Sequence, residues 1–224
     1  MAYMKRTPIV ILSSVAVFLA LTPGSLAKLT EVGEMPETTP PTVASCPTPS
    51  CLVVSRTTGF QVKVGTARNP LGVQREGTIV AWTVSLGKPN PTQIKFFDTN
   101  EGGPASAGIA VLRPQKSVRL GYQLVAQGPI VKLEKYFGKS AQFPLETTIK
   151  VKKGDVIALT VPTWAPALAL GFANTTSWRA SRPKAQCSST GSQTTQTAVG
   201  GSVRYYCLYS TARLTYSATL VSTP

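Results

Sequence analysis

The residues that could perform catalysis are few, because the 224-residue sequence contains no histidine. This absence excludes Ser-His-Asp triads, Cys-His pairs and histidine-ligated metal sites. Glycoside hydrolysis would require two carboxyl groups several ångströms apart. Beyond residue 45 the only carboxylates are Glu76, Asp98, Glu101, Glu134, Glu146 and Asp155. We expect Glu134 on a strand face and Asp155 in a turn. We therefore predict no enzyme, no catalytic residues and no cofactor, and a carboxylate-dependent glycan hydrolase or lyase is the remaining enzymatic alternative.

Two of these acids lie close in sequence, in the run Asp98-Thr99-Asn100-Glu101-Gly102-Gly103. Oxygen donors at alternating positions can surround calcium in a flexible loop. The run lacks the roughly six converging oxygens that such a site needs. A solvated turn between two strands accounts for Asp, Asn and Gly equally well. We therefore predict no metal site.

Two tryptophans are the strongest candidates for ligand contacts. Trp164 lies between Pro162 and Pro166, which could hold an aromatic face rigidly out of a loop. Trp178 directly precedes a run of cations. Rigid aromatic faces stack on sugars or bases, and adjacent cations would hold an acidic partner. The predicted ligand-binding residues are Trp164, Trp178, Arg179, Arg182 and Lys184. The alternative is that both rings are buried at the open ends of the fold.

Charge is the strongest anomaly of composition, with 23 Lys and Arg against 9 Asp and Glu. From Cys46 onward, 20 basic residues face only 6 acids. Such a domain is attracted to polyanions: cell-wall polymers, acidic polysaccharide, nucleic acid or a negative membrane surface. The alternative is a generally basic exported protein whose charge serves solubility, because the lysines are spread along the chain without a dense run.

The amino terminus resembles a secretory signal peptide. Lys5 and Arg6 precede an apolar run over residues 8–21, and Ser25-Leu26-Ala27 supplies small residues for cleavage after Ala27. The run is shorter than the roughly 20 residues that span a bilayer. We expect no transmembrane anchor after cleavage, and a secreted, extracellular or cell-surface-associated protein. A retained anchor, or a lipid on Cys46 after Val43-Ala44-Ser45, is the alternative.

The predicted organisation is a signal peptide over residues 1–27, a Pro/Thr/Glu-rich linker over 28–45 and a single β-sandwich domain over 46–224. Four cysteines in an exported chain indicate two disulfides, for which three pairings exist. We favour Cys46 with Cys51 and Cys187 with Cys207. The second pair would close a Ser/Thr/Gln/Gly-rich loop. A zinc site is disfavoured by the lack of histidine.

The stretch over residues 147–161 shows most clearly the alternation of apolar and polar residues that recurs along the chain. Ile149 and Val151 alternate with lysines, Gly154-Asp155 breaks the run, and Ile157, Leu159 and Val161 alternate again. This pattern predicts a strand, a tight turn and a second strand, each with one face on a core and the other in water.

Further strands are predicted along the chain, and Trp82 is expected in the core of one of them. Their residues are 52–56, 60–64, 78–86, 93–97, 108–112, 118–126, 130–137, 167–173, 202–209 and 214–221. No run of ten residues has helical period. Many short strands separated by turn residues indicate an all-β, two-sheet antiparallel β-sandwich, jelly-roll-like, and a five- to six-stranded barrel with long loops is the alternative.

Four segments in this order resemble a family of uncharacterised exported bacterial proteins. They are residues 78–82 (TIVAW), 108–114 (GIAVLRP), 151–159 (VKKGDVIAL) and 214–220 (LTYSATL). The resemblance implies a jelly-roll β-sandwich and export, with no established activity and no functional residues to carry over.

Together these observations predict an exported, non-enzymatic β-sandwich that binds a polyanionic or carbohydrate ligand, such as a cell-wall glycan, at or outside the cell surface. The alternative from a different class is a structural or protein-interaction module of the cell envelope. Exposed tryptophans beside clustered cations would favour binding, and buried rings with evenly spread charge would favour the structural role.

Overall fold

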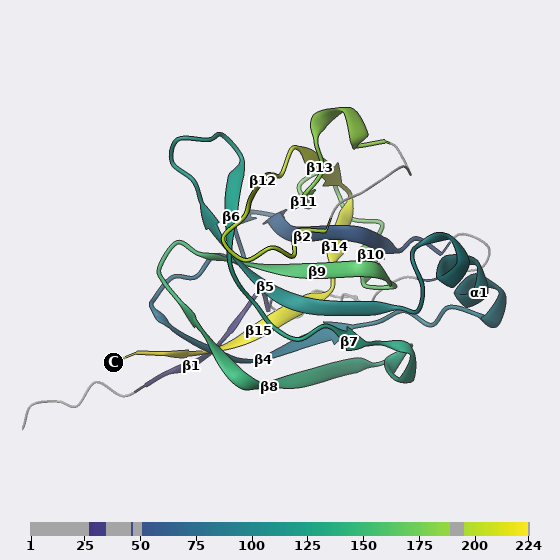
Figure 1. Cartoon of the computed structure of the whole chain (residues 1–224), viewed down its shortest axis with the longest axis horizontal. Coiled ribbons are helices and arrows are strands. Elements are labelled where there is room, and N and C mark those ends of the chain that lie inside the picture. The colour runs from purple at the N-terminus through teal and green to yellow at the C-terminus, as the bar shows by residue number, and fades with distance from the viewer. Residues whose placement is uncertain (1–26, 35–45, 47–50, 189–194, 224) are drawn as a thin grey trace, which may run out of the picture.

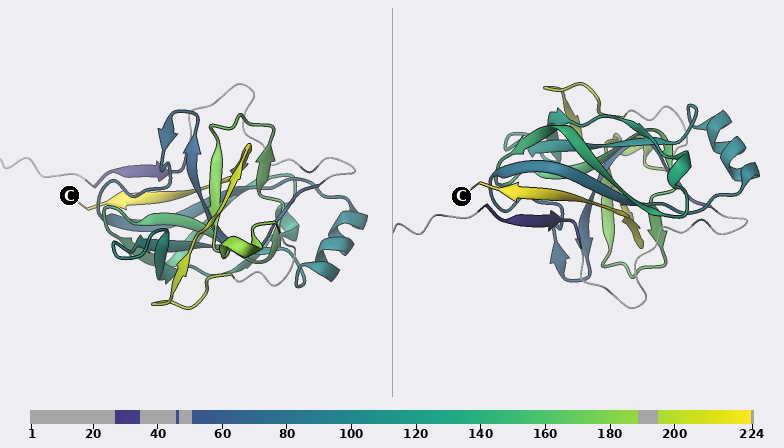
Figure 2. Two further views of the ribbon diagram at one scale, coloured as in Figure 1. Left: turned by 90° about the horizontal axis from the view of Figure 1, so that it is seen from above. Right: turned by 90° about the horizontal axis from the view of Figure 1, so that it is seen from below.

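The computed structural model describes residues 27–34, 46, 51–188 and 195–223. It confirms the predicted all-β, sandwich-like fold. Two antiparallel sheets face each other, and the larger of the two curls strongly (Figure 1). Sheet A has four strands, and Figure 2 (right) shows them side by side. Their order is β1 (Leu29–Val32), β15 (Tyr216–Ser222), β4 (Gly77–Ser85) and β8 (Ser140–Val151).

Sheet B is larger and supplies the other layer. Its main path is β12 (Ser202–Arg204), β6 (Gly121–Gln127), β5 (Ser106–Pro114), β9 (Val156–Ala165), β2 (Val54–Val64), β11 (Ser177–Ala180) and β13 (Cys207–Ser210). Short strands β3 (Ala67–Arg68) and β7 (Val131–Lys132) pair with β2 and β5. A separate pair consists of β10 (Leu168–Leu170) and β14 (Ala212–Leu214).

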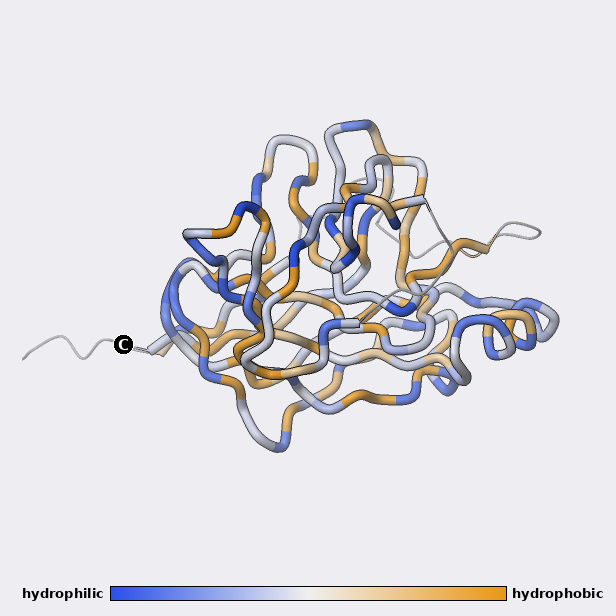
Figure 3. The backbone as a smooth tube through the Cα atoms, turned by 45° about the horizontal axis from the view of Figure 1, so that its top comes forward, coloured by the Kyte–Doolittle hydropathy of each residue, from blue (hydrophilic) through white to orange (hydrophobic). Residues whose placement is uncertain are grey.

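The core between the sheets contains the apolar residues that the alternating pattern predicts. Figure 3 shows hydrophobic stretches along the strands that cross the centre of the molecule. Trp82 is 1% exposed and its ring centroid lies 4.8 Å from that of Phe143, so its predicted core position is confirmed. In β9, however, Ile157, Leu159 and Val161 are fully buried, and so are the intervening Ala158 and Thr160. The prediction of a solvated face for this strand is wrong, because a further layer of chain covers it.

The stretch over residues 147–161 is strand, turn and strand, as predicted, but its two strands do not pair with each other. β8 pairs with β4 in sheet A, whereas β9 pairs with β5 and β2 in sheet B. The turn therefore carries the chain from one layer to the other. Gly154 has φ +91°, the left-handed conformation that glycine adopts readily.

Asp155 lies in this turn, as predicted, and is 1% exposed. Its carboxylate accepts hydrogen bonds from Nε and Nη2 of Arg113 at 2.8 and 2.9 Å and from the backbone N–H of Lys152 at 2.9 Å. The hydrogen bond to Asp155 raises the pKa of Arg113, partial desolvation opposes this shift, and the charge of the carboxylate adds to it. The end of β5 is thereby fastened to the sheet-to-sheet turn.

The predicted strand over residues 93–97 is wrong, because this segment lies in a helix, α1 (Pro91–Asn100). Asn90 accepts from the backbone N–H of Gln93, and the Gln93 side chain accepts from the backbone N–H of Asn90, which forms a capping box. Pro91 suits the first helical position. Phe97 is its only buried residue, so the hydrophobic periodicity on which helix prediction depends is weak.

The boundaries of other predicted strands also change. Residues 52–56 and 60–64 join into β2, which has an irregularity at Arg56, where φ is +40°. Residues 130–137 divide into β7 and a 3-10 helix, η1 (Glu134–Tyr136). Residues 202–209 divide into β12 and β13, which pair with different strands, β6 and β11.

The predicted linker begins with a strand. β1 pairs with β15, and the Glu31 carboxylate accepts hydrogen bonds from the hydroxyls of Ser217 and Thr219. Part of this segment therefore belongs to sheet A, although its sequence has no hydrophobic period. The predicted signal peptide up to residue 26, the rest of the linker at 35–45 and the lipidation motif at 43–45 lie outside the described residues.

Asp155→Asn should lower the free energy of unfolding by about 2 kcal/mol, since a hydrogen bond to a charged group contributes roughly 1.5 to 3 kcal/mol. Glu146→Gln is the matched control, because it makes the same carboxylate-to-amide change at an exposed position of β8. It should stay within about 0.5 kcal/mol of the parent protein. Urea denaturation of the three proteins measures both values, and equal midpoints would show that the turn does not depend on this carboxylate.

Candidate functional site

The predicted ligand contact Trp164 is fully buried near the end of β9, which continues through Ala165 in register with Val54 of β2. Its indole Nε1 donates a hydrogen bond to Oδ1 of Asp98 at 2.9 Å. Its ring centroid lies 4.9 Å from that of Phe97 and 5.5 Å from that of Phe137. The expected exposed aromatic face is therefore wrong, because Trp164 anchors α1 to the end of the sandwich.

Trp178 is also buried, at 6% exposure in β11. Its ring stacks on Tyr209 with a centroid distance of 4.7 Å and lies so close to Gly59 that a Cβ there would be 2.9 Å from it. Arg182, 9% exposed, donates to the hydroxyl of Tyr209 and to the carbonyl oxygen of Ser55. Trp178 and Arg182 thus close the outer face of sheet B, and neither offers a free surface to a ligand.

The structure does not bring the five predicted residues together. Trp164 is in register with Ser55 of β2, and Trp178 with Gln61 of the same strand. Six residues along a strand correspond to roughly 20 Å. Lys184 is exposed at the start of a short 3-10 helix, η2 (Lys184–Gln186), and Arg179 is half-buried in β11. The burial of both rings is the outcome that the alternative interpretation predicted.

Sheet B curls so that its two ends, with the chain that joins them, lie over the outer face of its central strands. These residues, 177–188 and 195–210, are called the cap. Both predicted disulfides are confirmed, and Cys187–Cys207 lies within the cap, while Cys46–Cys51 closes a short loop before β2. In Figure 2 (left) the strands of the cap run across the central strands of the same sheet. The Ser/Thr/Gln-rich loop that the second disulfide closes therefore covers a strand face, at least over its described residues.

A buried polar network, which the sequence does not reveal, joins the cap to the central strands of sheet B. Gln196, 4% exposed, donates from its side-chain amide to the carbonyls of Tyr122 and Gly201, and its Oε1 accepts from the hydroxyl of Tyr205 at 2.6 Å. Thr58 accepts from the Gln196 backbone N–H at 3.1 Å. Burial raises the pKa of Tyr205 well above its ordinary value, so that the phenol stays a donor. This network accounts for the buried polar side of β9.

Three loops meet at the end of the sandwich opposite α1, where the β8–β9 turn lies (Figure 1). Val73 donates to the carbonyl of Asp155 at 2.8 Å and accepts from the N–H of Gly154 at 2.9 Å, and Arg113 binds the Asp155 carboxylate. Loops 69–76, 113–121 and 152–155 are therefore fastened to one another. Five exposed cations project from them: Arg75, Lys116, Arg119, Lys152 and Lys153. We call this set the cationic end.

Negative charge is sparse at the cationic end. Its three loops contain two acids, the buried Asp155, which Arg113 already pairs, and the exposed Glu76. Arg179, a residue of the cap, adds to the positive region, and its guanidinium donates to the carbonyls of Tyr205 and Tyr206. Burial lowers the pKa of Arg179, Tyr122 opposes this shift, and the nearby charge of Arg119 adds to it. Of the five predicted ligand-binding residues, Arg179 is thus the one that lies near the cationic end.

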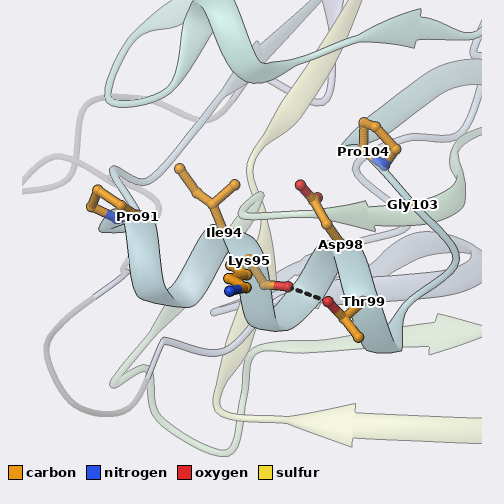
Figure 4. A pocket seen from close by; sticks show the side chains of 7 residues that line it. All are labelled: Pro91, Ile94, Lys95, Asp98, Thr99, Gly103 and Pro104. Atoms are coloured by element: carbon orange, nitrogen blue, oxygen red, sulfur yellow. Dashed lines mark hydrogen bonds between the residues drawn. The ribbon is translucent and has the colours of Figure 1, made fainter.

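A pocket of about 500 Å³ lies along α1, at the opposite end of the sandwich from the cationic end. It reaches to Gly103, where the Asp98–Gly103 run ends (Figure 4). Ile94 and Asp98 point to the same side of the helix, while the hydroxyl of Thr99 bonds the carbonyl of Lys95 at 2.8 Å. Asp98 is held by Trp164, and Glu101 pairs with Arg56 at 3.1 Å. Across the described ranges no three His, Cys, Asp or Glu residues are grouped as they would be around a metal ion.

Comparisons with protein-family models, with curated proteins and with solved structures found no match. The resemblance to exported bacterial β-sandwich proteins therefore stays a prediction. No helix within the described ranges has the length and apolar character needed to cross a membrane.

Replacing Cys187 and Cys207 together by Ser should lower the free energy of unfolding by about 3 kcal/mol, because the bond restricts a loop of the unfolded chain. The residues are separated by 20 positions in sequence. The matched control is Cys46→Ser with Cys51→Ser, whose separation of 5 positions gives a smaller entropic term of about 2 kcal/mol. Denaturant midpoints test which double variant loses more stability. A larger loss of unfolding free energy in the Cys46/Cys51 variant would contradict the loop-closure explanation.

Proposed function

We propose that this protein is an exported, non-enzymatic β-sandwich that binds a polyanion through its cationic end. The observation that carries the proposal is the gathering of five exposed cations on three fastened loops, with Glu76 as the one exposed acid among them. Clustered charge of one sign raises the local concentration of an oppositely charged polymer. Because the loops are hydrogen-bonded to a rigid sheet-to-sheet turn, little loop ordering opposes binding.

The charge at the α1 end differs in pattern. Exposed lysines occur there too, at positions 88, 95, 132, 135 and 139, but Asp98, Glu101 and Glu134 are interspersed with them. A mixture of both signs weakens the field that a long polyanion meets. This contrast supports the cationic end as the binding surface. Stacking of a sugar on Trp164 or Trp178 has no support, since both rings are buried, so a carbohydrate ligand would be an acidic one.

Export is supported by two observations. Both disulfides are formed, which suggests an oxidising, extracellular environment. In addition, β1 begins at Leu29, directly after the predicted cleavage position, so removal of residues 1–27 would leave every strand of sheet A intact. A cell-wall polymer or acidic polysaccharide is the kind of polyanion that such a protein would meet.

The second candidate function is a structural or protein-interaction module of the cell envelope. The burial of both Trp164 and Trp178 favours it, because the rings then serve packing alone. This function does not require the cationic end to bind a polymer, and the two candidates therefore give opposite results in a binding assay.

The experiment is binding of heparin and of polyphosphate to the secreted protein over a salt titration. Affinity should fall as salt rises, since exposed charges are screened over a Debye length of about 8 Å at physiological ionic strength. Lys116→Gln, Lys152→Gln and Lys153→Gln together should weaken binding roughly tenfold at low salt, because each exposed ion pair contributes about 0.2 to 1 kcal/mol. The salt dependence should also flatten.

The matched control is Lys88→Gln, Lys135→Gln and Lys139→Gln, which removes the same charge from exposed positions at the α1 end. At physiological ionic strength it should change affinity by less than about twofold, since the removed charges lie at the opposite end of the sandwich and the Debye length is then about 8 Å. Equal losses in the two triple variants would mean that total charge decides binding. No binding of either polymer at low salt would reject the proposal and favour the envelope module.

The intact mass of the secreted protein tests export and processing. We expect a chain that starts at Lys28, carries no lipid and is about 4 Da lighter than the reduced form, because two disulfides remove four hydrogens. A chain that retains Met1, a lipid on Cys46 or a thiol that reacts with an alkylating reagent would each contradict part of this prediction.

A further inference from the structure

A second pocket lies beside the cationic end, between β1 and the segment 68–75 that follows β2. Its volume is about 390 Å³, within the range of roughly 300 to 1,000 Å³ that is typical of small-molecule sites. Its walls come from β1, from the loop after β3 and from the end of β15. Its lining includes Arg75, which is also part of the cationic end, so the pocket and the proposed polymer surface are contiguous.

Positive charge predominates in this pocket. Lys28, Arg68 and Arg75 line it, together with one acid, Glu31. The Glu31 carboxylate already accepts hydrogen bonds from the hydroxyls of Ser217 and Thr219. Within the described part of the chain, none of the three cations lies within 4.0 Å of a carboxylate oxygen. An anionic group entering the pocket would therefore meet three cations that are not engaged in ion pairs with any described residue.

The remaining lining is both apolar and hydrogen-bonding. Val32 and Leu220 are 8% and 3% exposed and, with Pro70, form apolar wall. Thr30, Ser222, Asn69 and Gln74 add hydroxyl and amide groups. Such a mixture suits a compact ligand that has one anionic group, several hydroxyls and an apolar ring face.

The walls are held in place before any ligand arrives. Asn69 has φ +50°, donates from its backbone N–H to Val62 and accepts from the N–H of Gly72 at 2.9 Å. Its side chain lies so close to Gly72 that any Cβ there would collide with it. Across the pocket, the carbonyl of Lys28 accepts from the N–H of Ser222 at 2.9 Å. A preformed site loses little conformational entropy on binding.

We infer that this pocket binds a single acidic sugar unit, a monosaccharide that carries a carboxylate or a phosphate, at the end of or along the polyanion. The inference rests on the proposed function, which it deepens by naming an acidic glycan as the polymer. Arg68 and Lys28 pair with the anionic group, Thr30, Asn69 and Gln74 bond the hydroxyls, and Val32 and Leu220 contact the ring. Arg75 connects the pocket to the cations that hold the rest of the chain.

Glucuronic acid, glucose 6-phosphate and glucose are the probes, each titrated into the isotope-labelled secreted protein and followed by NMR chemical shifts. We expect both acidic sugars to shift the backbone amides of residues 29–32, 68–69 and 71–75, with glucose at least about tenfold weaker, since a charge-assisted hydrogen bond is worth about 1.5 kcal/mol or more. The stronger of the two acidic sugars distinguishes a carboxylate from a phosphate source. Equal binding of glucose would overturn the inference.

Arg68→Gln should weaken the binding of both acidic sugars roughly tenfold. Lys28→Gln should also weaken their binding. Arg204→Gln is the matched control, because Arg204 is also an exposed arginine, on β12, and does not line the pocket. The Lys116/Lys152/Lys153 triple variant should lose heparin affinity and keep glucuronic acid affinity. An unchanged affinity in Arg68→Gln, or a loss in Arg204→Gln, would refute the pocket.

The two proposals fail in different ways. Binding of heparin without binding of any acidic monosaccharide overturns the pocket and leaves the polymer surface standing. Binding of an acidic monosaccharide without any polymer overturns the proposed function and leaves a site for a free sugar acid. Chemical shifts confined to residues outside 28–32 and 68–75 would also overturn the pocket, because the acidic sugar would then bind elsewhere.

Discussion

The contact between Asp155 and Arg113 is the constraint on which the two-layer arrangement depends. The turn before β9 carries the chain from sheet A to sheet B, and at such a crossing no strand partner satisfies the backbone. The buried carboxylate compensates by accepting from Lys152 of the turn and from the Arg113 fork at the end of β5. A single buried charge is costly unless it is paired and hydrogen-bonded, and here both conditions hold.

The same turn determines where the positive charge gathers. Because Val73 bonds to both Gly154 and Asp155, the loop after β3 is attached to the crossing, and Arg113 attaches the loop after β5. Lysines and arginines that are dispersed in sequence therefore emerge at one end of the molecule. Their mutual repulsion reduces stability, and a rigid attachment is the kind of support that keeps such loops in place. A binding surface of this type depends on the hydrogen bonds that attach its loops to the β8–β9 turn. Neither of the predicted aromatic contacts, Trp164 and Trp178, contributes to it.

Sheet B is covered on both faces, which explains the composition of its central strand. One face of β9 meets the apolar core against sheet A, and the other carries Thr160 beneath the cap, where Thr58 and Gln196 supply hydrogen bonds. Buried polar groups are tolerated when their partners are complete. The covalent bond between Cys187 and Cys207 restricts the unfolded chain across the Ser/Thr/Gln-rich part of the cap, which has few apolar residues of its own.

The sequence by itself determined the all-β class, the position of most strands and the core location of Trp82, because strand alternation is a local property. It favoured the two disulfide pairings that the structure confirms, out of the three that four cysteines allow. It did not reveal α1, whose capping box is local but whose single buried residue, Phe97, leaves almost no periodicity. It also did not reveal β1, whose pairing with β15 joins segments nearly the whole chain apart. Only the tertiary structure decided that Trp164 and Trp178 are buried, since Asp98, Phe97 and Tyr209 reach them from elsewhere in the chain. Whether a side chain is exposed depends on what covers it, and no local pattern carries that information.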